Sequence, residues 1–454
     1  MSKVNNQGYN ALFRAMSVLT HRILRPSLLE RGKGVRLLLL CLWCASGAHA
    51  EVKYNIHQLS GWWWTAPEVP EIEVCVENTG DRAVTSVLTL EVETDTHVAY
   101  QSFRQQVSVG PKDSTTVTFF FNCEPGFYTC YLKGDEQPVD TFNIGFEPEN
   151  IVSLPDAQPD FGQFWDYALH ELSLVDPKFE IKEETDKSNK TGKVYLVKMR
   201  SLGDEEIQGY LTVPNKASRK HKFPVLVHYM GYGSEPWYAH PDSNPDMIEF
   251  VLSTRGQGLN KPNNKYGDWV VSGFGKKDEY YYRGAFMDCV RALDFIEQLP
   301  EADTDNIFAE GGSQGGAFTY AACALDPRKR IRAAAPWIPF LSDFPDYFKI
   351  VSWPAVPLQT EQKKWWMSDR DFYAFLSYFD IKNHARNVTC PILMGIGLQD
   401  PTCPPHTNFS GYNLLRVPKS FVIYTNCQHD TQHPDWDNRQ KEFFRQNMKN
   451  ISQK

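Results

Sequence analysis

The sequence lacks several patterns that would define other classes of protein. After residue 50, no segment approaches the roughly 20 apolar residues that a membrane-spanning helix needs. The sequence also contains no internal repeat and no low-complexity segment. These absences exclude an integral membrane span in the chain after residue 50, and they favour a globular protein built from ordinary domains.

Cysteine spacing typical of metal sites is also absent. Of the ten cysteines, two lie in the first 50 residues and eight lie beyond them. Those eight form no C-x-x-C motif and no Cys/His cluster with zinc spacing. Cys123 and Cys130 could close a small loop in an exported protein, and free buried thiols are an equally open alternative.

A surplus of basic residues is missing as well. The chain has 47 Lys and Arg against 55 Asp and Glu, which gives a formal net charge of −8. Residues 1–50 hold seven of the basic residues and one of the acidic residues, so the rest of the chain carries −14. Such an acidic protein is not expected to bind nucleic acid or anionic membranes.

The first 50 residues have the pattern of a secretory signal peptide. Basic residues precede a short apolar run at 37–45, and an A-x-A cleavage site follows at 48–50. We therefore predict a signal peptide at 1–50 and a secreted or periplasmic protein. The alternative is a signal anchor that is retained, and the shortness of the apolar run argues against it.

Residues 51–148 have the pattern of an all-β domain. Segments 71–77 and 84–93 alternate apolar and polar residues, and turn-forming residues separate short strands at regular spacing. We predict a small β-sandwich of immunoglobulin-like architecture here, followed by a linker at 149–160. Tryptophans occupy positions 62–64. They either stack on sugar or pack within the protein, and packing is favoured.

An α/β domain is predicted for residues 161–454. Helical patterning begins near Phe161, and from about Lys193 strands alternate with helices, as in a parallel α/β sheet. Residues 341–388 are rich in aromatics and lie between two predicted strands. This position indicates an inserted helical segment.

The most informative motif is G-x-S-x-G at residues 311–315. A buried strand is predicted at 306–310 and a helix at 316–325, so the motif has the strand–turn–helix context of a nucleophile elbow. Small residues allow the strand and the helix to approach closely in such a turn. We therefore predict an α/β-hydrolase fold with Ser313 as its nucleophile.

In this fold an acid and then a histidine follow the nucleophile along the chain, each at the end of a strand. Asp400 and His429 satisfy both the order and the placement. The histidine would take the serine proton, and the carboxylate would orient the histidine. The competing residues fit less well: they are His433, His406 and His384 for the base, and Asp343 and Asp430 for the acid.

An acyl-transfer transition state carries negative charge on an oxygen and needs pre-placed hydrogen-bond donors. One backbone donor is expected at Gln314, directly after the nucleophile. The other is expected in the loop 231–233, which follows an earlier strand. An ordinary tight turn is the alternative explanation of that loop.

Several motifs, in order, carry a resemblance to a known family. They are 228–232 (HYMGY), 255–258 (RGQG), 280–283 (YYYR), 311–316 (GGSQGG), 339–344 (PFLSDF), 397–400 (GLQD) with 403–405 (CPP), and His429. Between about residues 155 and 450, the chain resembles the acetyl xylan esterases and cephalosporin C deacetylases of carbohydrate esterase family seven.

The resemblance implies hydrolysis of acetyl esters on sugar hydroxyls through an acyl-enzyme, without a metal or organic cofactor. It implies Ser313, Asp400 and His429 as the triad. It also implies oxyanion donors at Tyr232 and Gln314, and bracing roles for Arg255 and Gln257. The expected partner is an acetylated oligosaccharide or polysaccharide.

Two features depart from the family. The residue after the triad histidine is usually Glu, and here it is Asp430. The predicted N-terminal β-sandwich is the second departure, because the minimal family domain lacks it. Family members commonly form hexamers, so the resemblance implies a homo-oligomer, but the added domain argues against that assembly.

Two other functions stay open. One is a broader carboxylesterase or peptidase of the α/β-hydrolase superfamily, whose larger substrate would need a wider pocket bounded by residues 341–388. The other is a non-catalytic carbohydrate-binding protein, which the presence of all three triad residues disfavours.

Overall fold

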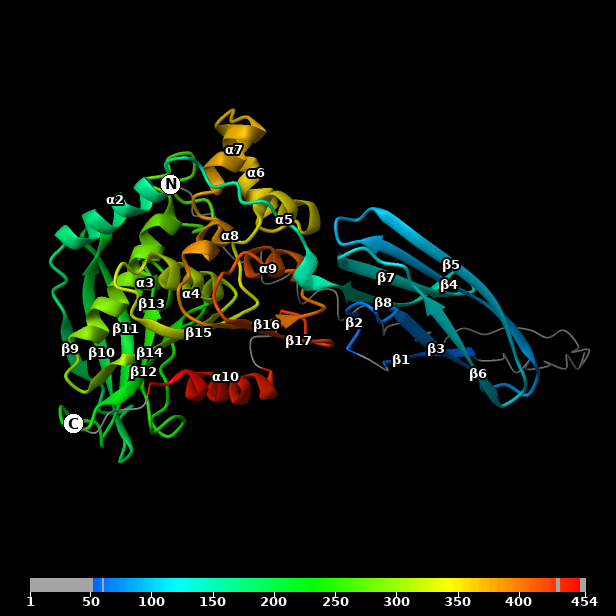
Figure 1. Ribbon diagram of the computed structural model, residues 1–454, viewed down its shortest axis with the longest axis horizontal. Coiled ribbons are helices and arrows are strands. Elements are labelled where there is room, and N and C mark those ends of the chain that lie inside the picture. Colours follow the sequence, from blue (N-terminus) through cyan, green and yellow to red (C-terminus); the bar gives the residue numbers. More distant parts are fainter. Residues whose placement is uncertain (1–51, 59–60, 430–432, 450–454) are drawn as a thin grey trace, which may run out of the picture. The chain divides into compact units, whose positions relative to one another are not determined.

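The computed structural model describes residues 52–58, 61–429 and 433–449 of the 454-residue chain (Figure 1). The predicted signal peptide at 1–50 lies outside the described residues. Within the described part of the chain, no helix combines the length and the apolar character needed to cross a bilayer. An N-terminal region of strands precedes a region in which strands and helices mix.

Eight strands between residues 52 and 146 form two sheets. The strands are β1 (Val52–His57), β2 (Trp63–Trp64), β3 (Glu71–Asn78), β4 (Val84–Thr94), β5 (Ala99–Val109), β6 (Asp113–Phe120), β7 (Gly126–Gly134) and β8 (Gln137–Phe146). One sheet has the order β1-β3-β6, and the other has the order β2-β8-β7-β4-β5. The short 3-10 helix η1 (Pro148–Asn150) follows the last strand.

Alternating side chains give these two sheets their buried faces. In β3, Ile72, Val74 and Val76 are fully buried while the residues between them are partly exposed. In β4, Leu88 and Leu90 are also fully buried. Because successive strand residues point to opposite faces, each sheet buries one side, as in a sandwich. The predicted strands at 71–77 and 84–93 are therefore confirmed.

The tryptophans at 62–64 pack within the protein. Trp62 and Trp64 are buried, and the Trp62 ring lies 4.5 Å from the Phe142 ring. The Trp63 ring lies 5.5 Å from the ring of Phe421. The structure thus supports packing over sugar stacking for these residues.

A nine-stranded sheet organises the rest of the chain, in the order β17-β16-β15-β14-β12-β13-β11-β10-β9. Its strands are β9 (Glu180–Glu183), β10 (Gly192–Ser201), β11 (Glu205–Pro214), β12 (Phe223–Tyr229), β13 (Ile248–Ser253), β14 (Ala302–Gly312), β15 (Ile331–Trp337), β16 (Ile392–Gly397) and β17 (Lys419–Tyr424). Neighbouring strands from β13 to β17 pair in parallel. This is the predicted α/β-hydrolase sheet.

The prediction of parallel alternation from about Lys193 is wrong at one edge of the sheet. β9, β10, β11 and β13 pair antiparallel. Only the 3-10 helix η2 (Leu202–Asp204) joins β10 to β11. A connection this short cannot hold a crossover, so the two strands form a hairpin.

Helices cover both faces of the sheet. They are α2 (Phe161–Leu174), α3 (Tyr281–Glu297), α4 (Gln314–Leu325), α9 (Pro405–Tyr412) and α10 (Pro434–Asn447), with the 3-10 helix η3 (Gly258–Asn263). In Figure 1, α3 and α4 lie on one side of the strands and α10 lies on the other. The Tyr229 hydroxyl donates to the Cys289 carbonyl of α3 (3.3 Å), so Tyr229 faces this first side.

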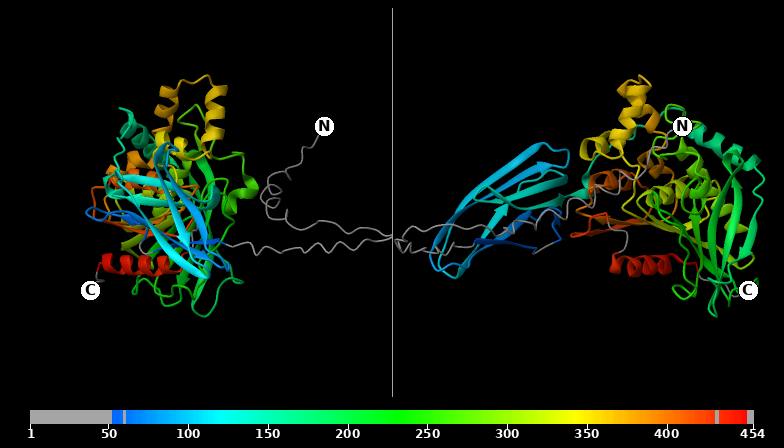
Figure 2. Two further views of the ribbon diagram at one scale, coloured as in Figure 1. Left: turned by 90° about the vertical axis from the view of Figure 1, so that its right-hand side faces the viewer. Right: turned by 180° about the vertical axis from the view of Figure 1, so that it is seen from behind.

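Four further helices lie between β15 and β16, within the segment expected to form an insertion. They are α5 (Phe344–Ile350), α6 (Ala355–Lys364), α7 (Asp369–Leu376) and α8 (Ile381–His384), followed by the 3-10 helix η4 (Ala385–Asn387). In both views of Figure 2, the yellow helices of this insertion lie on the side of the sheet opposite to α10, which is red.

Candidate active site

Ser313 occupies a strained turn between a strand and a helix. β14 ends at Gly312 and α4 begins at Gln314. Ser313 has φ 58° and ψ −120°, a conformation that residues with a side chain rarely adopt. Its backbone N–H donates to the Trp337 carbonyl (3.0 Å), and its own carbonyl accepts from the Phe340 N–H (3.0 Å). These bonds hold the strained serine at the end of the sheet.

Close backbone approach explains the glycines of the motif. A Cβ atom on Gly315 would lie 2.0 Å from the carbonyl oxygen of Tyr229 in β12. A Cβ atom on Gly311 would lie 2.5 Å from the backbone of Gly315. The helix therefore begins in contact with the strands, and this packing presents Ser313 at the sheet edge.

The structure brings Ser313, His429 and Asp400 into one hydrogen-bonded chain. His429 Nε2 lies 3.1 Å from the Ser313 hydroxyl oxygen, and His429 Nδ1 lies 2.9 Å from an Asp400 carboxylate oxygen. Asp400 follows β16 and His429 follows β17. Because these strands are parallel to β14, their carboxyl ends meet at the same edge. With a proton on Nδ1, the ring can accept the serine proton at Nε2.

Backbone donors hold the Asp400 carboxylate in place. One of its oxygens accepts from the N–H groups of Thr402 (2.8 Å) and Cys403 (2.9 Å). Asp400 is buried at 1% exposure. A buried carboxylate needs hydrogen-bond partners, and here these donors also fix its direction toward His429.

The competing histidines have other partners. His433 accepts from the Asp435 N–H (3.2 Å) and caps α10. His384 is buried against aromatic rings, and burial lowers its pKa to about 4. His406 lies 2.8 Å from an Asp95 oxygen through Nδ1. Among the described histidines, His429 is the one for which a bond to Ser313 is found.

The competing acid Asp343 has another partner. Asp343 pairs with the buried Lys382 ammonium (2.9 Å). Asp430 lies outside the described residues, so the departure from Glu at that position is not described either.

Cys403 is a buried thiol next to the serine. Burial raises the pKa of the Cys403 thiol well above its usual value. The thiol is therefore neutral near pH 7 and a poor nucleophile. Cys123 and Cys130, the pair that could have closed a small loop, are both free thiols.

Gln257 joins the loop after β12 to the start of α4. Its side-chain oxygen accepts from the Gly233 N–H (2.9 Å), and its amide nitrogen lies 3.3 Å from the side-chain oxygen of Gln314. A Cβ atom on Gly231 would lie 3.5 Å from the Gly312 carbonyl oxygen, so the loop 231–233 runs next to the elbow. Tyr232 therefore lies in the position expected of an oxyanion loop.

Arg255 is connected to the same region through Tyr281. Its guanidinium donates to both oxygens of the Asp288 carboxylate (3.0 and 2.7 Å), and Asp288 is fully buried. Tyr281 donates to the Arg255 carbonyl (2.9 Å) and accepts from the Gln257 amide (2.7 Å). Arg255 is thus connected to Gln257 through Tyr281.

Two bracing groups were missed by the sequence analysis. The Asp288 carboxylate and the Tyr282 hydroxyl, which donates to the Gln314 side chain (3.2 Å), both come from α3. Asp288 lies seven residues after Tyr281, so both project from one face of the helix. That spacing could be seen in the sequence, but the sequence did not indicate that Asp288 would bond Arg255 or that Tyr282 would bond Gln314.

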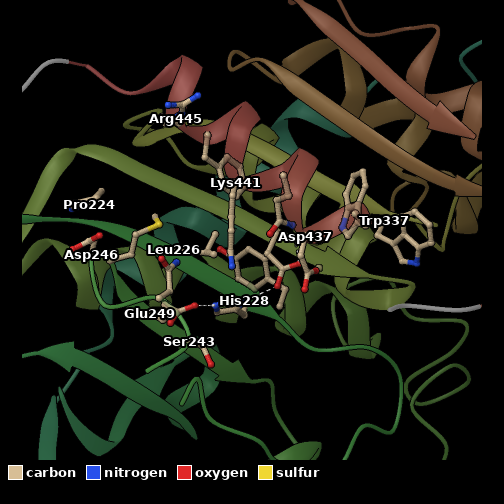
Figure 3. A pocket seen from close by; sticks show the side chains of 18 of the residues that line it. Pro224, Leu226, His228, Ser243, Asp246, Glu249, Trp337, Asp437, Lys441 and Arg445 are labelled. Atoms are coloured by element: carbon tan, nitrogen blue, oxygen red, sulfur yellow. Dashed lines mark hydrogen bonds and ion pairs between the residues drawn. The ribbon is translucent and has the colours of Figure 1, made fainter. Parts of the chain in front are cut away.

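Cavities lie on both sides of the sheet. A cavity of about 440 Å³ lies next to the acid of the triad: the triad residues themselves do not line it, but Pro401 and Thr402, which directly follow Asp400, do. A larger one, of about 1080 Å³, is lined by residues of β12 and α10 and by no triad residue (Figure 3). It opens on His228, which faces away from α3 because Tyr229, the next residue, faces α3. We therefore associate the smaller cavity with the site.

The larger cavity encloses a charged cluster. His228 Nδ1 bonds Glu310, and Nε2 lies 3.2 Å from a Glu249 oxygen. Burial alone would lower the pKa of His228, but its bonds to Glu249 and Glu310 raise it to about 10. The charged ring bonds both carboxylates, so the His228 ring has its partners within the fold.

A strained serine after β14, hydrogen-bonded to a histidine that is in turn hydrogen-bonded to an aspartate, is the arrangement of the α/β-hydrolase class. Comparison with protein families gives a narrower result. The family model for acetyl xylan esterase (AXE1) matches residues 152–448, and the chain belongs to this family.

Individual relatives agree with this result. The chain is 28% identical over 322 residues to the acetyl esterase Axe7A of Xylanibacter ruminicola, covering 68% of this chain and 72% of that protein. An acetyl xylan esterase from a Paenibacillus species has a solved structure similar to this one, with TM-score 0.62 and 30% identity over 66% of this chain and 98% of that chain. Acetyl xylan esterase 1 from a Thermoanaerobacterium species gives TM-score 0.60 and 25% identity over 67% and 98%. The chain is therefore a carboxylic ester hydrolase that acts on acetyl esters.

Proposed function

We propose that this protein is a secreted serine esterase that removes acetyl groups from acetylated sugars through an acyl-enzyme intermediate. The hydrogen-bonded chain from Ser313 through His429 to Asp400 is the observation that carries the proposal. Membership of the acetyl xylan esterase family supports the acetyl group as the part that is removed.

The geometry supports a two-step reaction. His429 Nε2 takes the Ser313 proton as the serine oxygen attacks the acetyl carbonyl carbon, and Asp400 stabilises the charged imidazole. The bond to the sugar oxygen then breaks, and His429 gives that oxygen the proton. Water, deprotonated by His429, attacks the acetyl-serine and releases acetate, which restores the serine hydroxyl.

The oxyanion of each step needs donors that are already in place. We assign these to the backbone N–H groups of Gln314 and Tyr232. The side chain of Gln257 supports this assignment, because it bonds both the Gly233 N–H and the side chain of Gln314. Gln257 and Arg255 are assigned as positioning residues.

Substrate and location are argued from the relatives and from the N-terminal pattern. The two solved relatives are acetyl xylan esterases. An acetylated xylan or its oligosaccharides is therefore our first choice of substrate. The signal-peptide pattern of residues 1–50 supports export from the cytoplasm. Polymers such as xylan are found outside the cell.

Replacing the nucleophile tests the mechanism. We expect Ser313→Ala to lower kcat on 4-nitrophenyl acetate by a factor on the order of 10⁴ or more, because the covalent route is lost. Ser173→Ala, which changes an exposed serine of α2, is the matched control and should retain full activity. Rapid-quench mass spectrometry of the wild type should detect one acetyl group on Ser313. A Ser313→Ala variant as active as the wild type would refute the proposal.

A further inference from the structure

Trp353 is a large aromatic side chain that the fold leaves partly open. It lies in the insertion between α5 and α6 and is 36% exposed. With Ile350, Val351 and Ser352 it forms one wall of the 440 Å³ cavity, and Pro401 and Thr402 form the other. A cavity of this volume is in the range that small-molecule ligands occupy.

The surroundings of Trp353 tie it to the reacting groups. Its ring stacks on the Phe340 ring (5.3 Å, 13° between planes), and the Phe340 N–H donates to the Ser313 carbonyl. Its ring also meets the ring of Tyr232 edge to face at 5.2 Å. Trp353 therefore contacts the loop 231–233 directly and is connected to the elbow through Phe340.

The opposite wall of the cavity belongs to the loop 400–402, which follows β16 and contains Asp400; we call it the acid loop. The Thr402 N–H donates to the Asp400 carboxylate (2.8 Å), and the Thr402 carbonyl accepts from the Tyr347 hydroxyl (2.5 Å). This loop is thus fixed from both sides. A group bound between Trp353 and Thr402 would lie next to the triad and outside it.

We propose that Trp353 and the 401–402 loop form a sugar-binding subsite, which holds the pyranose ring that carries the acetyl group or its neighbour. The negative face of an aromatic ring attracts the positively polarised C–H groups of a pyranose face. Phe340 covers one face of the Trp353 ring. The exposed part of the residue is then the surface available for a sugar. This subsite rests on the proposed function and deepens it.

Other exposed tryptophans do not share this position. Trp237, 41% exposed, lines the large cavity that contains no triad residue. Trp366 is 94% exposed and lines none of the cavities described above. The ring of Trp365 lies against Gly275, where an added Cβ atom would meet it at 2.8 Å. Trp353 alone among these four lines the 440 Å³ cavity, whose other wall is Pro401 and Thr402.

Comparing a small and a sugar substrate tests the subsite. We expect Trp353→Ala to lower kcat/KM on acetylated xylo-oligosaccharides about tenfold, since an aromatic contact is worth roughly that factor. The loss of kcat/KM on 4-nitrophenyl acetate should be several-fold smaller than the loss on the oligosaccharides, because that ester has no sugar to bind. Trp353→Phe should retain most of the sugar activity, and Trp237→Ala should change neither value.

Two results would overturn the subsite. The first is an equal loss on both substrates, which would show that Trp353 only supports Tyr232 or Phe340. The second is no loss on either substrate. Both outcomes differ from a failure of the proposed mechanism, which the Ser313→Ala variant reports separately.

Binding without turnover gives a second measurement. In the Ser313→Ala background, isothermal titration with unacetylated xylotetraose should give a dissociation constant about tenfold weaker when Trp353→Ala is added. Trp237→Ala in the same background should leave the constant unchanged. Equal affinity with and without the Trp353 ring would overturn the subsite even if catalysis is as proposed.

Discussion

At the scale of the residue, Arg255 of the R-G-Q motif forms a buried ion pair with Asp288. Arg255 is 7% exposed and Asp288 is fully buried. Two buried charges are tolerated only when each neutralises the other and their hydrogen bonds are satisfied. The Arg255 guanidinium also donates to the Leu202 carbonyl (3.1 Å), so most of its donors are used.

Removing one member of this pair should be costly. We expect Asp288→Ala to lower the free energy of unfolding by about 3–5 kcal/mol, because it leaves the Arg255 charge buried without its partner. Denaturant unfolding followed by fluorescence measures this change. Glu279→Ala, at an exposed pair with Lys276, is the control and should change stability by less than about 0.5 kcal/mol. A loss for Asp288→Ala no larger than this control would contradict the burial argument.

At the scale of the element, Gln257 connects two segments that come from different strands. The loop 231–233 follows β12, and α4 follows β14. Gln257 precedes η3 and bonds both segments through one amide group. Since the proposed oxyanion donors lie on these two segments, their separation depends on this side chain.

Gln257→Ala should therefore act on catalysis more than on binding. We expect kcat on 4-nitrophenyl acetate to fall about 10- to 100-fold with little change in KM, because small displacements of positioned donors are costly. Gln257→Glu keeps the acceptor for the Gly233 N–H and should recover part of the rate. Gln446→Ala, on the exposed side of α10, is the control. If kcat is unchanged while KM rises, Gln257 acts in substrate binding instead.

The elements were predictable to different extents, for physical reasons. Strands with strict alternation, such as β3, were found because a half-buried sheet imposes that period. The antiparallel hairpin of β10 and β11 was misjudged, since a strand buried on both faces and a hairpin strand can have similar composition. The order of Ser313, Asp400 and His429 was readable because each follows a strand end. The partners of Asp288 could not be predicted from the sequence, because contacts between residues far apart in the chain leave no local sequence pattern.

At the scale of the whole molecule, the N-terminal strands and the acid loop meet at His406. Its Nδ1 lies 2.8 Å from a carboxylate oxygen of Asp95, which follows β4, and its Nε2 lies 3.5 Å from an oxygen of Asp346 in α5. His406 itself lies in α9, directly after the acid loop. The sequence analysis assigned no partner to His406, because Asp95 lies more than 300 positions earlier in the chain.

The charge of His406 makes this contact depend on pH. Burial alone would lower the pKa of His406, but the Asp346 and Asp95 carboxylates raise it to about 10. In the unfolded chain the pKa of histidine is close to 6.5. The ion pairs therefore stabilise the folded state fully below pH 6.5, and their contribution is lost as the pH rises toward 10.

Replacing His406 with glutamine should therefore destabilise the protein more near pH 6 than near pH 10. We expect His406→Gln to lower the free energy of unfolding by on the order of 1–3 kcal/mol at pH 6, and by progressively less up to pH 10. Denaturant unfolding at a series of pH values measures the difference between the variant and the wild type. His240→Gln, at an exposed pair with Asp242, is the control and should show almost no effect at any pH. If the loss of unfolding free energy for His406→Gln stays constant from pH 6 to pH 10, the residue acts through packing. Its charge then does not join the N-terminal strands to the acid loop.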